Sequence, residues 1–422
     1  MKKLLLTFLT FITLLICSSQ KDEKNNIPII KLENYINKWD QINLSQFLPN
    51  IRYIRIQSAD SPLSIMHMDC LFSKNVILVK DYSNCYLYDI NGNFLNKVGN
   101  MGRGPGEYLL ASTTSFGRNG NLYLKGSYDM IEYSLDGKLI SRYKNLLKNN
   151  TGNVENWLQI DDSLFLGYVS NSTGVEKNRL IIFNKKGEVK NALKNYRILN
   201  RKGSFYADQE QHADLYRFED QIFIKQIVND TLFTLSSKFK LEPKYVFDFG
   251  KYTYQPFLGK PEDLLKYSTD QGNKIWLNNL FQIHDYYFLC CNFNFNFPGK
   301  RLTPKIVRND VTTDYNTTLA LGVLNKETNK LIFCKPTNTD DPLFTTGLFN
   351  DIDGGPRFYP MRMINDSTMV MWIDPKLFKD HIKSPEFKNC IPLYPEKKQA
   401  LIDFASKISE FDNAVLMLVT LK

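Results

Sequence analysis

Short runs of alternating apolar and polar residues recur along the chain, and each follows a polar turn that ends in Asn or Asp. The runs lie at residues 76–79, 122–124, 164–166, 222–224, 286–289 and 369–372. Such alternation is typical of half-buried β-strands. A second strand follows in each unit and often ends in a tight turn such as Asn91–Gly92 or Asp136–Gly137, which are strong hairpin signals.

This repeat predicts six units of four antiparallel strands, the plan of a six-bladed β-propeller. The expected blades cover residues 65–98, 111–143, 157–196, 213–249, 275–334 and 358–421. Blade six lacks an outer strand, and we expect the alternating run at residues 51–56 to supply it, which closes the ring and removes an open edge. Residues 397–409 carry apolar side chains at helical spacing and predict one short helix outside the sheets, so the fold class is all-β with one helix.

The long connections all fall between strands two and three of a blade or between blades. They lie at residues 144–156, 250–274, 292–316, 336–357 and 375–410. In a propeller both kinds of connection emerge on the same face, and insertions in repeat folds usually build the binding surface. We therefore expect the partner, a glycan, a peptide or another protein, to bind on this face.

The N-terminus has the features of an export signal. Lys2 and Lys3 precede an apolar run at residues 4–16, which is too short to cross a bilayer as a helix and is typical of a secretory signal. Residues 14–17 end in Cys17 and resemble the lipobox at which bacterial lipoproteins are cleaved and acylated. We expect a signal peptide at residues 1–16, lipidation of Cys17, a flexible tether at 17–40 and the propeller at 41–422.

Composition and charge narrow the partners further. Aromatic residues make up 13% of the chain, which favours strands over helices. The formal charge is +9, but no basic stripe is interleaved with aromatic residues, so no nucleic-acid partner is expected. The six cysteines besides Cys17 match no zinc pattern, and adjacent Cys290 and Cys291 should point to opposite faces of one strand.

Three motifs resemble those of the six-bladed β-propeller lipoproteins of Bacteroidota, which are related in fold to NHL and TolB-type propellers. The motifs lie at residues 102–108 (GRGPGEY), 229–233 (NDTLF) and 351–360 (DIDGGPRFYP). The resemblance covers residues 40–422. It implies the propeller architecture and a lipid anchor in the outer membrane, and residues 20–23 are similar to the short acidic signal for the cell surface. It implies no shared activity.

Several residues are candidates for binding or chemistry. Arg103 and Glu107 lie in the glycine-rich turn, where Glu107 either binds a ligand or accepts backbone N–H bonds. Asp351 and Asp353 suit a calcium ion or form a plain turn. The other candidates stand at or near the starts of innermost strands: His67 and His212, which could meet Arg357 on the axis as a metal or acid–base cluster, and Trp157, Trp276 and Tyr359, which either pack in the core or stack on a ligand.

Two functions are consistent with this pattern. The first is a surface-tethered, non-catalytic binding propeller that captures a glycan or peptide or docks a partner protein. The alternative is a metal-dependent hydrolase or lyase with its site at the propeller channel. Convergence of His67, His212 and nearby carboxylates would favour the enzyme, whereas an apolar or Arg- and Tyr-lined channel would favour binding.

Overall fold

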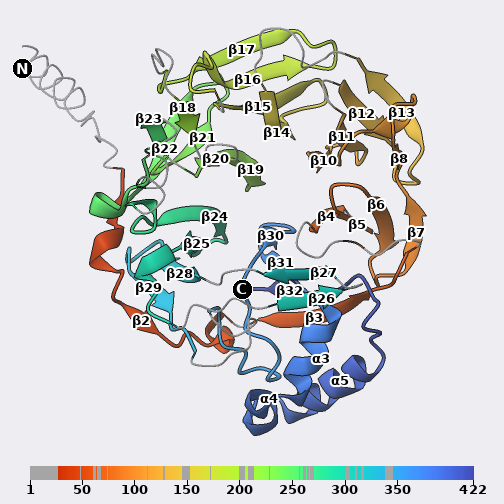
Figure 1. Ribbon diagram of the computed structural model, residues 1–422, viewed down its shortest axis with the longest axis vertical. Coiled ribbons are helices and arrows are strands. Elements are labelled where there is room, and N and C mark those ends of the chain that lie inside the picture. Colours follow the sequence, from red (N-terminus) through yellow and green to blue (C-terminus); the bar gives the residue numbers. More distant parts are fainter. Residues whose placement is uncertain are drawn as a thin grey trace, which may run out of the picture.

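The fold is a closed ring of six β-sheets, seen in a computed structural model of the chain (Figure 1). The structure describes residues 27–422 except 48, 60–62, 64–67, 74, 112, 127–128, 145–152, 172, 199–204, 208–212, 228, 256, 260–262, 264–265, 267–269, 300–304, 309–310, 315–317 and 338–345. The first strand of each sheet lies around the centre of Figure 1 and the last lies at the rim, which confirms the predicted six-bladed propeller.

Blades one to five each contain four antiparallel strands whose order in space follows the chain. Blade one comprises β4 (Asp69–Ser73), β5 (Val76–Lys80), β6 (Cys85–Asp89) and β7 (Phe94–Lys97). Blade two comprises β10 (Thr114–Phe116), β11 (Leu122–Gly126), β12 (Asp129–Tyr133) and β13 (Leu139–Tyr143). Blade three comprises β14 (Asn153–Gln159), β15 (Leu164–Ser170), β16 (Asn178–Asn184) and β17 (Val189–Lys194).

The later blades have the same plan with longer insertions. Blade four comprises β19 (Ala213–Phe218), β20 (Gln221–Gln226), β21 (Thr231–Leu235) and β22 (Leu241–Asp248). Blade five comprises β24 (Trp276–Gln282), β25 (Tyr286–Asn292), β28 (Leu319–Asn325) and β29 (Leu331–Cys334). Between blades and within insertions lie the short pairs β8 (Asn100–Met101) with β9 (Glu107–Tyr108), β18 (Phe205–Ala207) with β23 (Phe257–Gly259), and β26 (Lys305–Arg308) with β27 (Val311–Asp314).

Blade six joins the two ends of the folded chain. Its strands are β30 (Arg362–Met363), β31 (Thr368–Ile373), β32 (Ala414–Thr420) and, on the outside, β3 (Asn50–Ile56). The strand β3 pairs with β32 in continuous antiparallel register from Asn50 opposite Thr420 to Ile56 opposite Ala414. The predicted closure of the ring by residues 51–56 is therefore confirmed.

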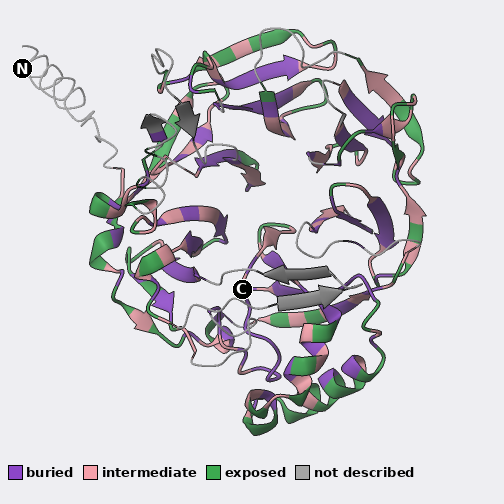
Figure 2. Cartoon of the chain, in the orientation of Figure 1, coloured by how far each residue is buried: buried purple, intermediate pink, exposed green. Residues whose placement is uncertain are grey.

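The blades are held together by apolar cores at their interfaces, and Figure 2 shows that the middle strands of the blades are the buried ones. Successive residues of a strand point to opposite faces of its sheet, so each strand contributes to two of these cores. Cys290 packs toward blade six with Met369 and Met417, whereas Cys291 packs toward blade four with Phe247. The prediction that the paired cysteines face opposite ways is confirmed.

The tether prediction is wrong for residues 27–40. The strand β1 (Ile29–Lys31) pairs parallel with β22, and β2 (Trp39–Asp40) pairs parallel with β29, so blades four and five each gain a fifth strand. The cause is apolar burial, because Ile30, Leu32 and Ile36 enter the core between these two blades. Residues 17–26 lie outside the described residues.

The helix prediction is incomplete. The predicted helix at 397–409 corresponds to α5 (Pro395–Ser406), but α3 (Pro375–Lys383) and α4 (Pro385–Asn389) precede it, and all three lie outside the ring beside β3 in Figure 1. Phe378 of α3, Phe387 of α4 and Leu401 of α5 join the core of blades five and six. Among the described residues, no helix has the length and apolar character needed to cross a bilayer.

The topology gives the ring two unlike faces. Connections from strand one to two and from strand three to four are short, and none is longer than Gly117–Asn121. We call the face that they form the short-turn face. Connections from strand two to three and between blades form the opposite face, which we call the looped face. It carries the β26–β27 hairpin, and the insertion that holds α3 to α5 begins and ends on it.

Candidate functional site around the propeller axis

Two Asp–Lys pairs occupy equivalent places in blades one and four. Asp69 of β4 stands directly opposite Lys80 of β5, and Asp214 of β19 stands directly opposite Lys225 of β20. Each pair lies where the first strand begins and the second ends, which is the looped face. Blades one and four are three apart in a ring of six, so β4 and β19 lie on opposite sides of the axis (Figure 1). With Arg362 of β30, these four residues form what we call the axial cluster.

Arg362 links blade six to the pair in blade one. Its Nε donates to Asp69 Oδ1 at 2.8 Å and its Nη2 donates to Asp69 Oδ2 at 2.8 Å, a bidentate arrangement that fixes both side chains. Lys80 Nζ lies 3.8 Å from the same carboxylate and donates to the Ala111 carbonyl of blade two at 2.9 Å. Asp69 therefore lies beside two cations, Lys80 of its own blade and Arg362 of blade six.

The pair in blade four is more deeply set. Burial raises the pKa of Asp214 to about 6, against the opposing effects of the Leu280 N–H and of the Lys225 and Arg362 charges. Burial likewise lowers the pKa of Lys225 to about 8. Lys225 Nζ is held by the carbonyl oxygens of Gln226 at 2.5 Å and Asn229 at 2.7 Å, so its charge is solvated by backbone rather than by water.

The axial cluster belongs to a belt of polar contacts that crosses every seam between blades. Beginning at the seam of blades six and one, the contacts are Arg362 with Asp69, Lys80 with the Ala111 carbonyl, Lys125 with Asn153, Asn156 with the Ala213 carbonyl, the Leu280 N–H with Asp214, and the Cys290 thiol with the Pro360 carbonyl. The belt thus satisfies buried polar groups and fixes how neighbouring blades meet.

The accessible part of this site is a charged pair. The side chain of Arg362 is 40% exposed and that of Asp69 is 23% exposed, whereas Lys80 and Lys225 are buried. A guanidinium and a carboxylate side by side can bind polar groups of a ligand through charge-assisted hydrogen bonds. Within the described part of the chain, no three His, Cys, Asp or Glu side chains lie close enough to hold a metal ion.

His67 and His212, two of the predicted site residues, lie outside the described residues. Their sequence context is nevertheless informative, because His67 precedes Asp69 by two positions and His212 precedes Asp214 by two positions. In both blades Lys follows the Asp at the same interval, since 80 − 69 = 11 and 225 − 214 = 11. This repeated His-x-Asp…Lys pattern is the signal that could have found the axial cluster, which sequence reasoning missed.

The glycine-rich turn joins blade one to blade two, as predicted for a junction between units. Glu107 Oε2 accepts the Gly104 N–H at 2.6 Å, so this carboxylate holds the turn. A Cβ at Gly102 would lie 2.1 Å from the same oxygen, which explains why glycine is needed there. Arg142 Nη1 donates to the Gly104 carbonyl at 2.6 Å and fixes the turn to blade two. Arg103 is exposed and stays a candidate for ligand binding.

The predicted aromatic residues divide between core and surface. Trp157 is buried between blades two and three, where its Nε1 donates to Ser115 Oγ at 3.0 Å. Tyr359 packs against the core between blades five and six. Trp276 is only partly buried at the start of β24 and packs edge-on against Tyr254 with ring centroids 5.9 Å apart. Trp276 therefore presents part of its ring on the looped face, where a ligand can reach it.

Arg357 does not reach the axis. Its guanidinium lies 4.9 Å from the centre of the Phe349 ring and 3.7 Å from Glu386 of α4, which is outside the ring in Figure 1. The prediction that Arg357 lies on the axis is therefore wrong, while the two histidines lie outside the described residues. The physical reason is that the connection from blade five to blade six first packs against the helical insertion before it enters β30.

The structure does not bring Asp351 and Asp353 together as a calcium site. Asp351 accepts hydrogen bonds from the backbone N–H and the hydroxyl of Ser45, at 3.0 and 2.5 Å. Asp353 is buried, which raises its pKa, and its Oδ1 accepts from the Gly355 N–H at 2.8 Å and Asn350 Nδ2 at 2.7 Å. The two carboxylates thus anchor one turn to two separate networks.

Comparison with known proteins agrees with this fold. An exported protein from Bacteroides fragilis NCTC 9343 has a crystal structure that is 16% identical, with a TM-score of 0.64 over 93% of this chain and 99% of that one. A member of the DUF4221 family from Bacteroides vulgatus is 11% identical, with a TM-score of 0.41 over 67% of this chain and 84% of that one, too distant to bear on function. No curated protein is similar in sequence.

The first of these structures shows the fold alone, and with it the resemblance to β-propellers of Bacteroidota is confirmed. One family model matches residues 27–420, the whole propeller together with the two N-terminal strands that sequence reasoning had placed in a tether. By this match the chain belongs to the family described as domain of unknown function DUF4934.

Proposed function

We propose that this protein is an exported, lipid-anchored propeller that binds its partner on the looped face without catalysing a reaction. The observation that carries the proposal is the belt around the axis, in which charged side chains bond groups of the neighbouring blade: Arg362 bonds Asp69, Lys80 bonds the Ala111 carbonyl, and Asp214 accepts the Leu280 N–H. Groups arranged in this way hold a rigid surface, whereas a general acid or base must be free to exchange a proton with a substrate. The partner is a glycan, a peptide or another protein.

The anchor is the lipid on Cys17, and we place the protein at the outer membrane with its propeller at the cell surface. The folded part begins by Ile29, so at most residues 17–28 separate the lipid from the first strand. Twelve residues reach about 40 Å when fully extended. The propeller is therefore held close to the membrane rather than on a long flexible arm.

Replacement of the acylated residue tests the anchor. In Cys17→Ser the thiol that would carry the lipid is absent, and one hydroxyl cannot substitute for acyl chains in membrane binding. We expect the exported variant to move from the membrane fraction to the soluble fraction. Fractionation and metabolic labelling with a palmitate analogue measure this, with Ser18→Ala as the matched control. Membrane retention of Cys17→Ser with unchanged labelling would contradict the anchor.

A metal-dependent hydrolase or lyase at the axis is the second candidate. The His-x-Asp…Lys pattern at 67–80 and 212–225 favours it, because it repeats the same chemistry in two blades that face each other. Two histidines and two carboxylates are a ligand set that suits zinc and other divalent cations. This candidate would use Asp69 and Asp214, which also belong to the axial cluster. Removal of metal should abolish the function of an enzyme and leave the affinity of a binding protein unchanged, so it separates the two candidates.

Binding by the looped face can be measured with glycan and peptide arrays. We expect saturable binding by the full chain, reduced at least tenfold in Trp276→Ala, because this partly exposed ring is an aromatic contact on that face. The matched control is Lys138→Gln, on a short turn between strands three and four, where the side chain is 82% exposed. Equal loss in both variants, or no loss in Trp276→Ala, would contradict a site on the looped face.

A further inference from the structure

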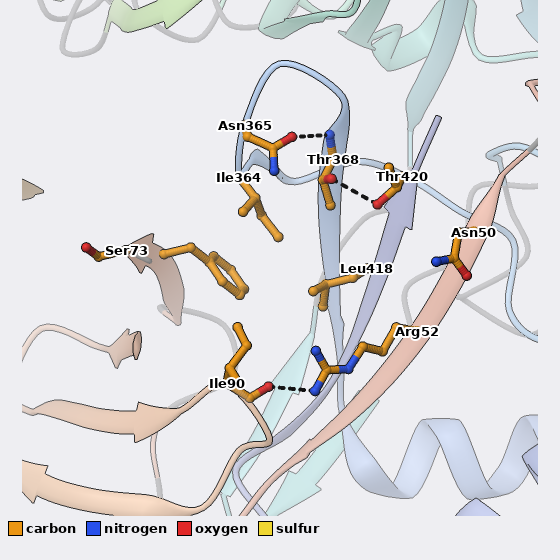
Figure 3. Close-up of a pocket in the computed structure, with 10 residues that line it drawn as sticks. Asn50, Arg52, Ser73, Ile90, Ile364, Asn365, Thr368, Leu418 and Thr420 are labelled. Carbon is orange, nitrogen blue, oxygen red and sulfur yellow. Dashed lines mark hydrogen bonds between the residues drawn. The ribbon is translucent and has the colours of Figure 1, made fainter. Parts of the chain in front are cut away.

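A cavity lies on the short-turn face, at the seam where the ring closes (Figure 3). Its volume is about 440 Å³, within the range of small-molecule sites. Its lining includes Arg52 of β3, Phe72 of β4, Ile90 after β6, Ile364 after β30, and Leu418 and Thr420 of β32. It therefore lies between blades six and one, away from the looped face.

The guanidinium of Arg52 is held in place on one side and available on the other. Its Nη2 donates to the Ile90 carbonyl at 2.9 Å and to Asn91 Oδ1 at 2.8 Å, and both contacts belong to blade one. Nε and Nη1 have no hydrogen-bond partner among the described residues, and Figure 3 shows Nη1 turned toward Leu418. With Nη2 held in this way, Nη1 is left to donate a charge-assisted hydrogen bond to a carboxylate in the cavity.

The remaining lining complements an apolar body. Ile364 and Leu418 point into the same space in Figure 3, and Phe72 also lines the cavity. The hydroxyls of Thr368 and Thr420 bond each other at 2.9 Å, and Asn365 Oδ1 accepts the Thr368 N–H at 2.9 Å. Arg52 is the single charged residue in the described lining, so the electrostatic preference is for an anion.

We propose that this cavity binds a small carboxylate with an apolar body, its carboxylate on Arg52 and its apolar part between Phe72 and Leu418. This site is independent of the looped face and of the partner proposed for it. Because the lining comes from β3, β32 and blade one, the ligand touches both ends of the folded chain at the closing seam. Binding therefore stabilises the closed ring, as any ligand of the folded state does.

The test uses the full chain with 4-phenylbutyrate as the probe and its neutral amide as the control ligand. We expect saturable binding by calorimetry and a melting temperature that rises with probe concentration. The amide should bind at least tenfold more weakly, because it lacks the charge that pairs with Arg52. A tripeptide that ends in a free Phe carboxylate distinguishes a peptide C-terminus from a free acid as the source of this chemistry.

Two variants locate the site, and one matched variant controls for the loss of a charge. Arg52→Gln should weaken the probe at least tenfold, and Thr420→Phe, which fills the cavity and leaves Arg52 in place, should do the same. Arg217→Gln is the control, because Arg217 Nη2 also bonds carbonyls of the neighbouring blade on the short-turn face, those of Gln159 and Ile160, but does not line the cavity. It should bind the probe as the unmodified chain does.

Several outcomes would overturn the proposal. They are the absence of binding at millimolar probe, equal binding of acid and amide, and equal effects of Arg52→Gln and Arg217→Gln. Melting curves without probe show whether each variant is folded. If Thr420→Phe does not fold, Arg52→Lys replaces it. Lys keeps the charge but has one nitrogen, which cannot bond Ile90 and Asn91 as Nη2 does and also reach the ligand as Nη1 does, so this variant should still weaken the probe.

Discussion

Ile54→Asp in the closing strand should lower the free energy of unfolding by about 4 kcal/mol, or prevent folding. Ile54 is 2% exposed and lies opposite Leu416 in the pairing of β3 with β32. A carboxylate there is removed from water without a partner, and it lies in the strand that joins the N-terminal and C-terminal parts of the ring. Urea unfolding followed by circular dichroism measures the loss.

The matched control is Ile29→Asp in β1. Ile29 also belongs to an N-terminal strand added to a blade, but it is 59% exposed. Its replacement should change the free energy of unfolding by about 0.5 kcal/mol or less, as surface substitutions usually do. Equal effects of the two variants would contradict the closure of the ring by β3.

Asp214→Asn should stabilise the protein at neutral pH. The pKa of Asp214 is raised by burial to about 6, above its usual 3.8, so the folded state holds this proton more tightly than the unfolded chain does. Ionisation therefore costs stability: the penalty is absent below about pH 4, grows between pH 4 and 6, and is constant above. One pKa unit corresponds to about 1.4 kcal/mol, so the rise from 3.8 to about 6 makes the full penalty about 3 kcal/mol.

Asparagine keeps the oxygen that accepts the Leu280 N–H and removes the charge. The variant should match the unmodified chain near pH 4 and exceed it by up to about 3 kcal/mol at pH 7, since the raised pKa of Asp214 already includes the favourable effect of the Lys225 charge. Unfolding in urea across this range measures the difference. A difference that does not change with pH would contradict the buried state of this carboxyl.

Asp69→Asn is the matched control for Asp214→Asn, because Asp69 stands in blade one at the place that Asp214 occupies in blade four. There both carboxylate oxygens accept a hydrogen bond from Arg362, and an amide has only one oxygen to accept them, so the substitution should destabilise the protein at pH 7. The two variants thus have opposite signs at the same position of the repeat. This contrast tests whether Arg362, rather than the position itself, determines the role of the acid.

The propeller could be predicted from the sequence because each blade repeats one local pattern. Strand alternation and Gly-containing turns are properties of a few neighbouring residues, and they recur often enough to give the number of blades. The closing strand followed from the same logic, since residues 51–56 alternate and blade six lacked an outer strand. The structure pairs these residues with β32 as expected.

The missed elements depended on signals that compete with the strand pattern. Asp374 caps α3 by accepting the Lys376 N–H at 2.8 Å, and Ser384 caps α4 by accepting the Phe387 N–H at 3.1 Å. Each cap is followed by a proline, a local start signal that could have been recognised. The strands β1 and β2 were missed because they pair with distant blades, and only the apolar residues in the supposed tether indicated burial.

The candidate site was less predictable than the fold. Contacts such as those of Arg362 with Asp69 and of Asp214 with Leu280 join residues far apart in the chain, so their geometry follows from ring closure and not from local sequence. Asp351 and Asp353 resembled metal ligands, but Asp351 binds the distant Ser45, and Asp353 binds the neighbouring Asn350 and the distant Tyr53. Spacing alone could not distinguish a structural carboxylate from a metal ligand.

The central claim, a looped face that binds without catalysis, is tested most directly by recovering a bound ligand. A glycan or peptide selected on the arrays is incubated with the full chain, with and without EDTA, and its mass is measured together with the metal content of the protein. We predict that the ligand is recovered intact, that EDTA leaves its affinity unchanged, and that no stoichiometric metal is found. A cleaved ligand, or stoichiometric metal whose removal abolishes binding, would contradict the claim and favour an enzyme at the axis.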